Sequence, residues 1–149
     1  MTSIFIPADR EALCLRLANL EPGAPRQWGK MDPAQMLRHC SIALSDVLGE
    51  RVVKQAFLGK LITPLIRSQV FGPKPFRRNS PTDPVYMVAE PVAFEAECSR
   101  LATRIDQVVQ RGASKADGRI HPFFGRLTGA DWGCLIYKHL DHHLRQFGV

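Results

Sequence analysis

Apolar residues recur at the spacing of amphipathic helices in five stretches of this chain, and no stretch is a convincing strand. Segments rich in proline and glycine separate these stretches, and we expect them to be loops. The longer of the two main loops is long enough to border a functional site. The predicted helices cover residues 7–20, 32–49, 52–71, 91–112 and 128 to near the C-terminus, and the two main loops cover 72–91 and 113–127.

Two of these helices carry clear start signals. Asp32 can cap the second helix, and Gln35, three residues later, completes a capping-box pattern. Thr128 and Asp131 form the same pattern at the start of the last helix. Gly49 is the expected stop of the second helix, because glycine readily adopts the left-handed conformation that ends helices.

The third segment, 52–71, is apolar and basic and contains Pro64. A proline inside a helix removes a hydrogen bond and clashes with the preceding turn, so we expect a kink or a break there. For this segment we favour a kinked core helix over a helix that lies on a membrane surface, because its polar face is thin.

The length and composition fit one folded unit. The chain has 149 residues, 45% of them hydrophobic, so we expect a single domain over residues 1–149. Four long helices and one short or kinked helix predict an all-α fold, a four-helix bundle. No apolar run approaches a membrane span, and the first ten residues lack the pattern of a secretory signal, so we expect a cytoplasmic protein with no membrane partner.

The charge balance is basic, with a net charge of +6, but no nucleic-acid-binding motif accompanies it. We therefore expect no nucleic-acid partner, whereas attraction of small anions is compatible with this charge. The four cysteines, Cys14, Cys40, Cys98 and Cys134, are far apart in sequence and lie among apolar residues, so we expect buried free thiols.

The last helix carries three of the five histidines within five positions. On a helical wheel with Trp132 at zero, its apolar residues gather between zero and about 80°. His139 falls at about 340° and His143 at about 20°, so both lie within the apolar face. His142 falls on the shoulder of that face, and Asp141 falls on the side expected to face water.

A shared metal ion explains this pair of histidines. Hydrogen bonds alone satisfy two buried imidazoles poorly, whereas an ion takes a lone pair from each ring. The residue after His139 is Leu140, so the general-base glutamate of the zinc peptidases is missing and we reject that class. Catalytic sites usually hold the ion with three protein ligands. His39, at the edge of the apolar face of the second helix, is the best third ligand, although alone it would more simply be a hydrogen-bonded core residue.

Three stretches of the chain then resemble a known family. They are W-G-K-M-D-P-A-Q-M-L-R-H, the loop N-S-P-T-D-P, and the C-terminal run 121–148, which begins H-P-F-F-G and ends H-L-D-H-H-L-R-Q-F-G. A histidine midway along an early helix, followed by H-x-x-H-H-x-x-Q on the last helix, resembles the DinB/YfiT-like superfamily of metalloenzymes, in one bacterial branch. The resemblance spans roughly residues 28–148.

This resemblance implies an up-down-down-up four-helix bundle, often dimeric, with a zinc, nickel or iron ion on three histidines. By motif, the ligands correspond to His39, His139 and His143, which the wheel also selects. Characterised relatives include thiol S-transferases of stress or detoxification and a thiol-dependent isomerase, so the implied partner is a small-molecule thiol or another small substrate. Gln146 of the motif could hydrogen-bond a ligand, or it could be a polar surface residue.

Three functions remain open. The first is a metal-dependent thiol S-transferase, in which Arg77 and Arg78 could hold the carboxylates of the thiol, although a solvated basic turn is the simpler interpretation of these two residues. His121 could be a general base, a fourth ligand or a hydrogen-bonded anchor of its loop. The second function is a hydrolase that uses metal-activated water, and the third is a non-catalytic metal-binding or structural bundle.

Overall fold

The computed structural model describes residues 2–149, and this part of the chain is mostly helical. Its elements follow one another in the order α1 (Pro7–Ala18), α2 (Pro33–Leu48), α3 (Phe57–Phe71), the 3₁₀ helix η1 (Pro84–Tyr86), α4 (Phe94–Ala116), β1 (Ile120–His121), β2 (Gly125–Arg126) and α5 (Gly129–Gln146). The expectation of a predominantly α-helical chain is therefore confirmed. Within residues 2–149, no helix is both long enough and apolar enough to cross a membrane.

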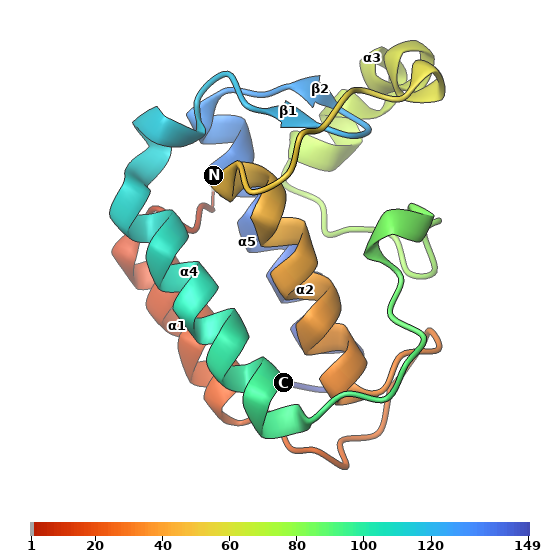
Figure 1. Cartoon of the computed structure of the whole chain (residues 1–149), viewed down its shortest axis with the longest axis vertical. Helices are drawn as coiled ribbons and strands as arrows, with labels where there is room; N and C mark the ends of the chain where they lie inside the picture. Colours follow the sequence, from red (N-terminus) through yellow and green to blue (C-terminus); the bar gives the residue numbers. More distant parts are fainter. Residues whose placement is uncertain (1) are drawn as a thin grey trace.

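Helices α1, α2, α4 and α5 lie against one another and enclose the core (Figure 1). The apolar faces predicted for α2, α4 and α5 supply most of it, because residues three and four apart along a helix share one face. Buried members of these faces are Met36, Cys40 and Leu44 of α2, Leu101, Ile105 and Val108 of α4, and Trp132, Ile136 and Leu140 of α5.

The predicted helix ends of α2 and α5 are confirmed. The Asp32 side chain accepts a hydrogen bond from the backbone N–H of Gln35, and the Gln35 side chain accepts one from the N–H of Asp32. Thr128 and Asp131 form the same reciprocal pair at the start of α5. Gly49 ends α2 with a φ of +69°, in the left-handed region that favours glycine.

The expectation of a core helix over 52–71 is wrong. Helix α3 begins only at Phe57 and lies at one end of the molecule (Figure 1), where Gly59 and Thr63 face the rest of the protein. The other helices already fill the core, so most of the apolar side chains of α3 remain outside it. No break occurs at Pro64: both Pro64 and Lys60 are exposed, so the carbonyl of Lys60, which loses its helical partner, lies on the solvent side.

The loop predicted over 113–127 is also corrected. Helix α4 extends to Ala116, beyond Gly112, which leaves the helical conformation with a φ of +77° before the helix resumes. The two short strands β1 and β2 then pair antiparallel, although no strand was expected. Each strand has only two residues, too few to show an alternating pattern, and tertiary packing therefore decides their conformation.

Helix α1 covers the side of α5 that was expected to face water. Asp141 is consequently buried, and its carboxylate pairs with Arg16 of α1 and with Arg145 one turn along α5, each at 2.7 Å. Leu13 is the residue of α1 that enters the core, whereas Cys14 beside it is exposed, so the expectation of a buried thiol is wrong at that position.

Candidate metal centre

Three histidines that are distant in sequence meet between α2 and α5. One potential ligand atom from each of His39, His139 and His143 lies within 4.8 Å of the other two, and we call this group the histidine cluster. The Nε2 atoms of His39 and His139 are 2.9 Å apart. The structure thus brings together the three residues that the sequence singled out as ligands.

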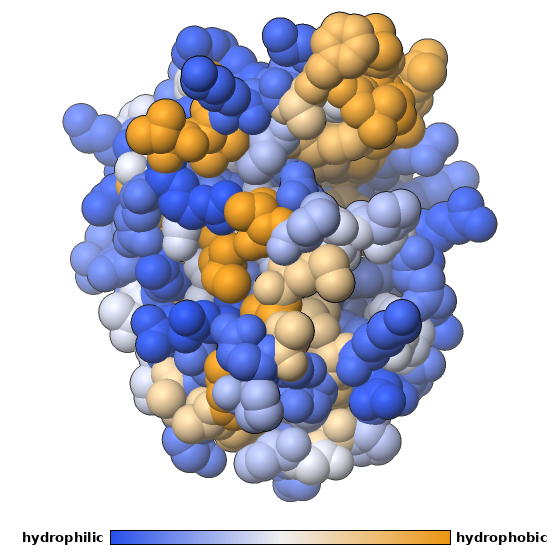
Figure 2. All heavy atoms as spheres, turned by 45° about the vertical axis from the view of Figure 1, so that its right-hand side comes forward, coloured by the Kyte–Doolittle hydropathy of each residue, from blue (hydrophilic) through white to orange (hydrophobic). Residues whose placement is uncertain are grey.

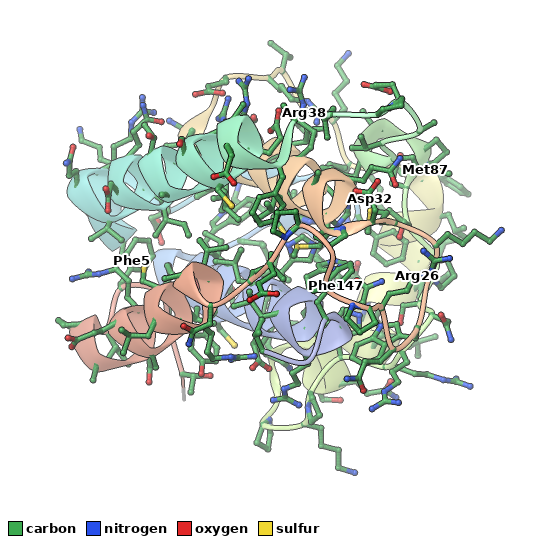
Figure 3. The ribbon with its side chains drawn as sticks, turned by 90° about the horizontal axis from the view of Figure 1, so that it is seen from below. Phe5, Arg26, Asp32, Arg38, Met87 and Phe147 are labelled. Atoms are coloured by element: carbon green, nitrogen blue, oxygen red, sulfur yellow. The ribbon has the colours of Figure 1, made fainter. Side chains whose placement is uncertain are left out.

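The antiparallel course of α2 and α5 explains why they meet. Asp32, at the start of α2, and Phe147, at the end of α5, lie at the same end of the molecule (Figures 1 and 3). At 1.5 Å per residue, His39 lies about 10 Å from that end, and His143 and His139 lie about 6 and 12 Å from it. The two histidines of α5 therefore bracket the level of the histidine on α2.

Hydrogen bonds on the outer sides of two rings fix their orientation. His39 donates from Nδ1 to the backbone carbonyl of Tyr86 at 2.9 Å, and His143 donates from Nδ1 to Oε1 of Gln146 at 2.9 Å. Gln146 in turn donates from Nε2 to the carbonyl of Trp28 at 2.8 Å, which identifies its other amide atom as the acceptor. With Nδ1 protonated, each neutral ring keeps the lone pair of Nε2 for the interior of the cluster.

The rings of the cluster are neutral near pH 7. Burial is the main cause that lowers the pKa of His39 and lowers the pKa of His143 to about 3. The pKa of His139 lies well below its ordinary value because of burial and, after that, because of the neighbouring His143 and His39. A metal ion binds imidazole only in its neutral form, so these rings are ready to act as ligands.

The size of the cluster fits one metal ion. Two nitrogens that each lie 2.0–2.1 Å from a zinc-like ion can be at most about 4.2 Å apart, so a small side-chain adjustment brings the cluster within that limit. Histidine nitrogen is a favoured ligand of zinc, nickel and iron. His39 and His143 are buried, and His139 is partly exposed as a whole residue.

The loop before α4 supplies a support for His39 that the sequence analysis missed. Tyr86, on η1, accepts the Nδ1 hydrogen bond of His39 with its carbonyl, and its hydroxyl donates to the buried carboxylate of Asp46. Arg51 lies 3.5 Å from the other oxygen of Asp46. Asp83 caps η1 by accepting a hydrogen bond from the N–H of Val85. This aspartate of N-S-P-T-D-P was the sequence signal that could have predicted the turn at Tyr86.

Aromatic and cationic side chains surround His142, the histidine outside the cluster. Its ring centroid lies 5.5 Å from that of Trp28 and 6.1 Å from that of Phe76. The guanidinium of Arg78 lies 4.3 Å above the Trp28 ring, so this residue reaches the surroundings of the cluster. Arg77 is exposed, and its carbonyl accepts a hydrogen bond from Ser80.

His121 lies outside the histidine cluster and anchors the turn between β1 and β2. Its Nδ1 accepts hydrogen bonds from the backbone N–H groups of Phe123 and Phe124 at 3.0 and 3.2 Å. Burial lowers the pKa of His121 to about 4, so the neutral ring carries its proton on Nε2 and has no free lone pair for a substrate proton. These contacts favour the structural interpretation over a general base or a fourth ligand.

Fold and site together define a mostly helical protein with a three-histidine cluster that can hold a metal ion. The family model described as "Protein of unknown function (DUF1569)" matches residues 6–148, and the chain belongs to this family. No curated protein and no solved structure gives a significant match to the chain.

Proposed function

We propose that this protein is a metal-dependent enzyme on a DinB/YfiT-like, up-down-down-up four-helix bundle, with a zinc, nickel or iron ion held by His39, His139 and His143. One observation carries the proposal: three neutral imidazoles from two helices converge, and two of them point Nε2 inward because Nδ1 donates outward. Metal-binding histidines characteristically make such outward hydrogen bonds.

A purely structural role explains the cluster less well. In the neutral rings, one N–H lies between the Nε2 atoms of His39 and His139 and joins these two atoms in a hydrogen bond. That bond leaves the lone pair on Nε2 of His143 without a donor from the other two rings. A cation accommodates all three lone pairs at once. Burying several uncharged imidazoles also costs free energy at neutral pH that metal binding offsets.

The reaction class that we propose is thiol S-transfer to a small electrophile. An ion held by neutral ligands keeps its charge and lowers the pKa of a bound thiol, which is the chemistry that the cluster would gain from it. In the transfer, sulfur forms a bond to the electrophilic carbon, the leaving group departs with its electron pair, and the thiol proton passes to solvent. In this proposal Arg78, whose guanidinium lies over the Trp28 ring, attracts a carboxylate of the thiol together with Arg77, its neighbour in the chain.

Elemental analysis of the purified protein tests the metal. We expect about one ion per chain in the wild type and its loss in His39→Ala, His139→Ala and His143→Ala. His142→Ala is the matched control, because this neighbouring histidine lies outside the cluster and the variant should keep its ion. A wild-type protein that binds no zinc, nickel or iron after reconstitution would overturn the proposal.

Assays with a defined thiol and a chromogenic electrophile test the reaction. We expect product formation that needs both metal and thiol and disappears in His143→Ala. Turnover of an ester without any thiol would identify a hydrolase instead, and a metal-loaded protein inactive in both assays would identify a non-catalytic metal-binding bundle. Light scattering tests the homodimer that we also propose, and cell fractionation tests the cytoplasmic location.

A further inference from the structure

Helix α3 exposes an apolar strip that the rest of the chain leaves uncovered. Phe57, Leu61 and Leu65 are 77%, 59% and 76% exposed, and Leu58 is 59% exposed. At 100° per residue these four side chains fall within an arc of about 100°. The raised hydrophobic group at the top of Figure 2 lies where α3 is found, and we call these four residues the α3 strip.

The strip is fixed in place, because the opposite side of α3 is anchored. Thr63 donates from its hydroxyl to the carbonyl of Phe123 at 3.1 Å, and a Cβ on Gly59 would lie only 2.3 Å from that same oxygen. At the far end of the helix, the ammonium of Lys138 donates to the carbonyls of Val70 and Gly72. The strip therefore faces outward because its helix is held, and it cannot turn into the core.

The net positive charge of the protein is concentrated on the segment that carries the strip. Residues 51–82 contain seven of the 20 Lys and Arg residues and none of the 14 Asp and Glu residues. The other 117 residues contain 13 basic and 14 acidic residues, so they are close to neutral.

Six of the seven bases are exposed, and two of the seven have acidic partners. Arg51 and Arg67 pair with Asp46 and Asp131 from outside the segment. The exposed bases of the segment that enter no such pair are Lys54, Lys60, Lys74, Arg77 and Arg78. On the helical wheel Lys60 lies beside the α3 strip, about 100° from Leu61. From there its long side chain can extend along an apolar surface and keep its charged end in water.

We infer that the α3 strip docks on an anionic lipid surface, in a manner independent of the histidine cluster. An apolar face flanked by lysine and arginine, without acidic residues, has the character of a helix that lies in the interface of a negatively charged bilayer. Pairing with a second copy through α3 would instead place two basic segments face to face, which Coulomb repulsion opposes. This inference departs from the expectation of no membrane partner.

Vesicle sedimentation tests the inference with the metal-free and the metal-loaded full chain. We expect binding to vesicles of phosphatidylglycerol and phosphatidylcholine, little binding to phosphatidylcholine alone, and release by 0.5 M salt. Replacing Leu61 and Leu65 with Asp should weaken partitioning by about tenfold or more per residue. Lys54→Glu with Lys60→Glu should weaken it by about 30-fold or more, since each basic side chain near the surface contributes about fivefold to binding and both are lost.

Matched controls separate the strip from general surface properties. Leu15, on α1, is 63% exposed, so Leu15→Asp places the same charge at an equally exposed leucine and should leave vesicle binding unchanged. Lys115→Glu, at an exposed lysine outside the segment, should change it far less than the change at Lys54 and Lys60. Phe57→Trp keeps the strip apolar and reports docking through tryptophan fluorescence. Its emission should shift to the blue when anionic vesicles are added.

Three outcomes would overturn the inference. The first is a folded wild-type protein that does not sediment with anionic vesicles and shows no Phe57→Trp shift. The second is a dimer in solution that Leu61→Asp dissociates, because the strip would then cover a second copy. The third is binding to duplex DNA that exceeds vesicle binding and depends on the lysines but not on the leucines.

Discussion

Replacing Gln146 with Leu should weaken metal binding, because it removes the hydrogen bond that orients His143. Gln146 is only 3% exposed and joins two partners, accepting from Nδ1 of His143 and donating to the carbonyl of Trp28. Leucine has a similar volume but offers neither interaction. The ring of His143 would keep its place in the core while losing the group that holds its tautomer.

The expected magnitudes follow from these two contacts. Loss of the outward hydrogen bond of a ligand histidine typically weakens metal binding 10- to 100-fold, about 1.4–2.7 kcal/mol. In the metal-free protein, the variant leaves the buried N–H of His143 and the carbonyl of Trp28 unpaired, and each unpaired group costs about 1–3 kcal/mol. We therefore expect the free energy of unfolding to fall by about 2–6 kcal/mol.

A chelator-competition titration and urea unfolding measure the two effects separately. Gln146→Glu provides a test within the same site: its carboxylate still accepts from His143 but cannot donate to Trp28, so we expect metal affinity close to wild type and a reduced stability. Gln69→Leu, at an exposed glutamine of α3, is the control and should change neither quantity. Metal affinity of Gln146→Leu within twofold of wild type would refute the idea that this hydrogen bond orients the ligand.

Three further predictions follow from individual contacts. The pKa of His143 is lowered to about 3 in the folded protein, so on acidification its imidazole is protonated in the unfolded chain at a higher pH than in the folded one, and the free energy of unfolding of the metal-free protein should fall between pH 7 and 5.5. Urea unfolding of His143→Leu should show a fall that is smaller by about 1 kcal/mol. An unchanged pH dependence in this variant would contradict the assigned burial. Tyr86→Phe leaves the buried carboxylate of Asp46 without its hydroxyl donor and should lower the free energy of unfolding by about 1.5–3 kcal/mol. Metal affinity should change little, because His39 donates its hydrogen bond to the backbone carbonyl of residue 86, which the variant keeps. Equal melting temperatures of variant and wild type would count against the contact with Asp46. Gly59→Ala should lower the melting temperature and speed hydrogen exchange in α3, because the new methyl group crowds the carbonyl of Phe123. This crowding costs about 1–3 kcal/mol and outweighs the gain in helix propensity of about 1 kcal/mol. A higher melting temperature would show that α3 does not contact the turn at Phe123.

Local sequence signals predicted those parts of the fold that local interactions determine. The ends of α2 followed from Asp32, Gln35 and Gly49, whose roles involve only neighbouring backbone groups. The inward direction of His139 and His143 followed from the helical repeat, because both lie on the face of α5 that packs against the core. The candidate ligands were therefore predictable once α2 and α5 were recognised as helices.

Features that depend on packing between distant segments were not predictable in the same way. Asp141 lies opposite the apolar face of its helix, and nothing in its neighbourhood indicates that α1 covers it with Arg16. The apolar composition of α3 indicates a helix but not that other helices already occupy the core. The support of His39 by Tyr86 joins residues 47 positions apart, through a carbonyl that any residue could supply.

The spacing of the histidine cluster along the chain gives an ion bound there a mechanical role. His39 and His139 are separated by 100 residues, so a common ligand would tie the chain into a loop that contains α3, α4 and the short hairpin. A covalent bridge over a loop of that length removes conformational entropy worth about 4.7 kcal/mol from the unfolded chain, and coordination bonds that persist in that state would do the same. The ion would then serve as a reversible cross-link, and its removal would lower the free energy of unfolding of the whole chain by up to about that amount.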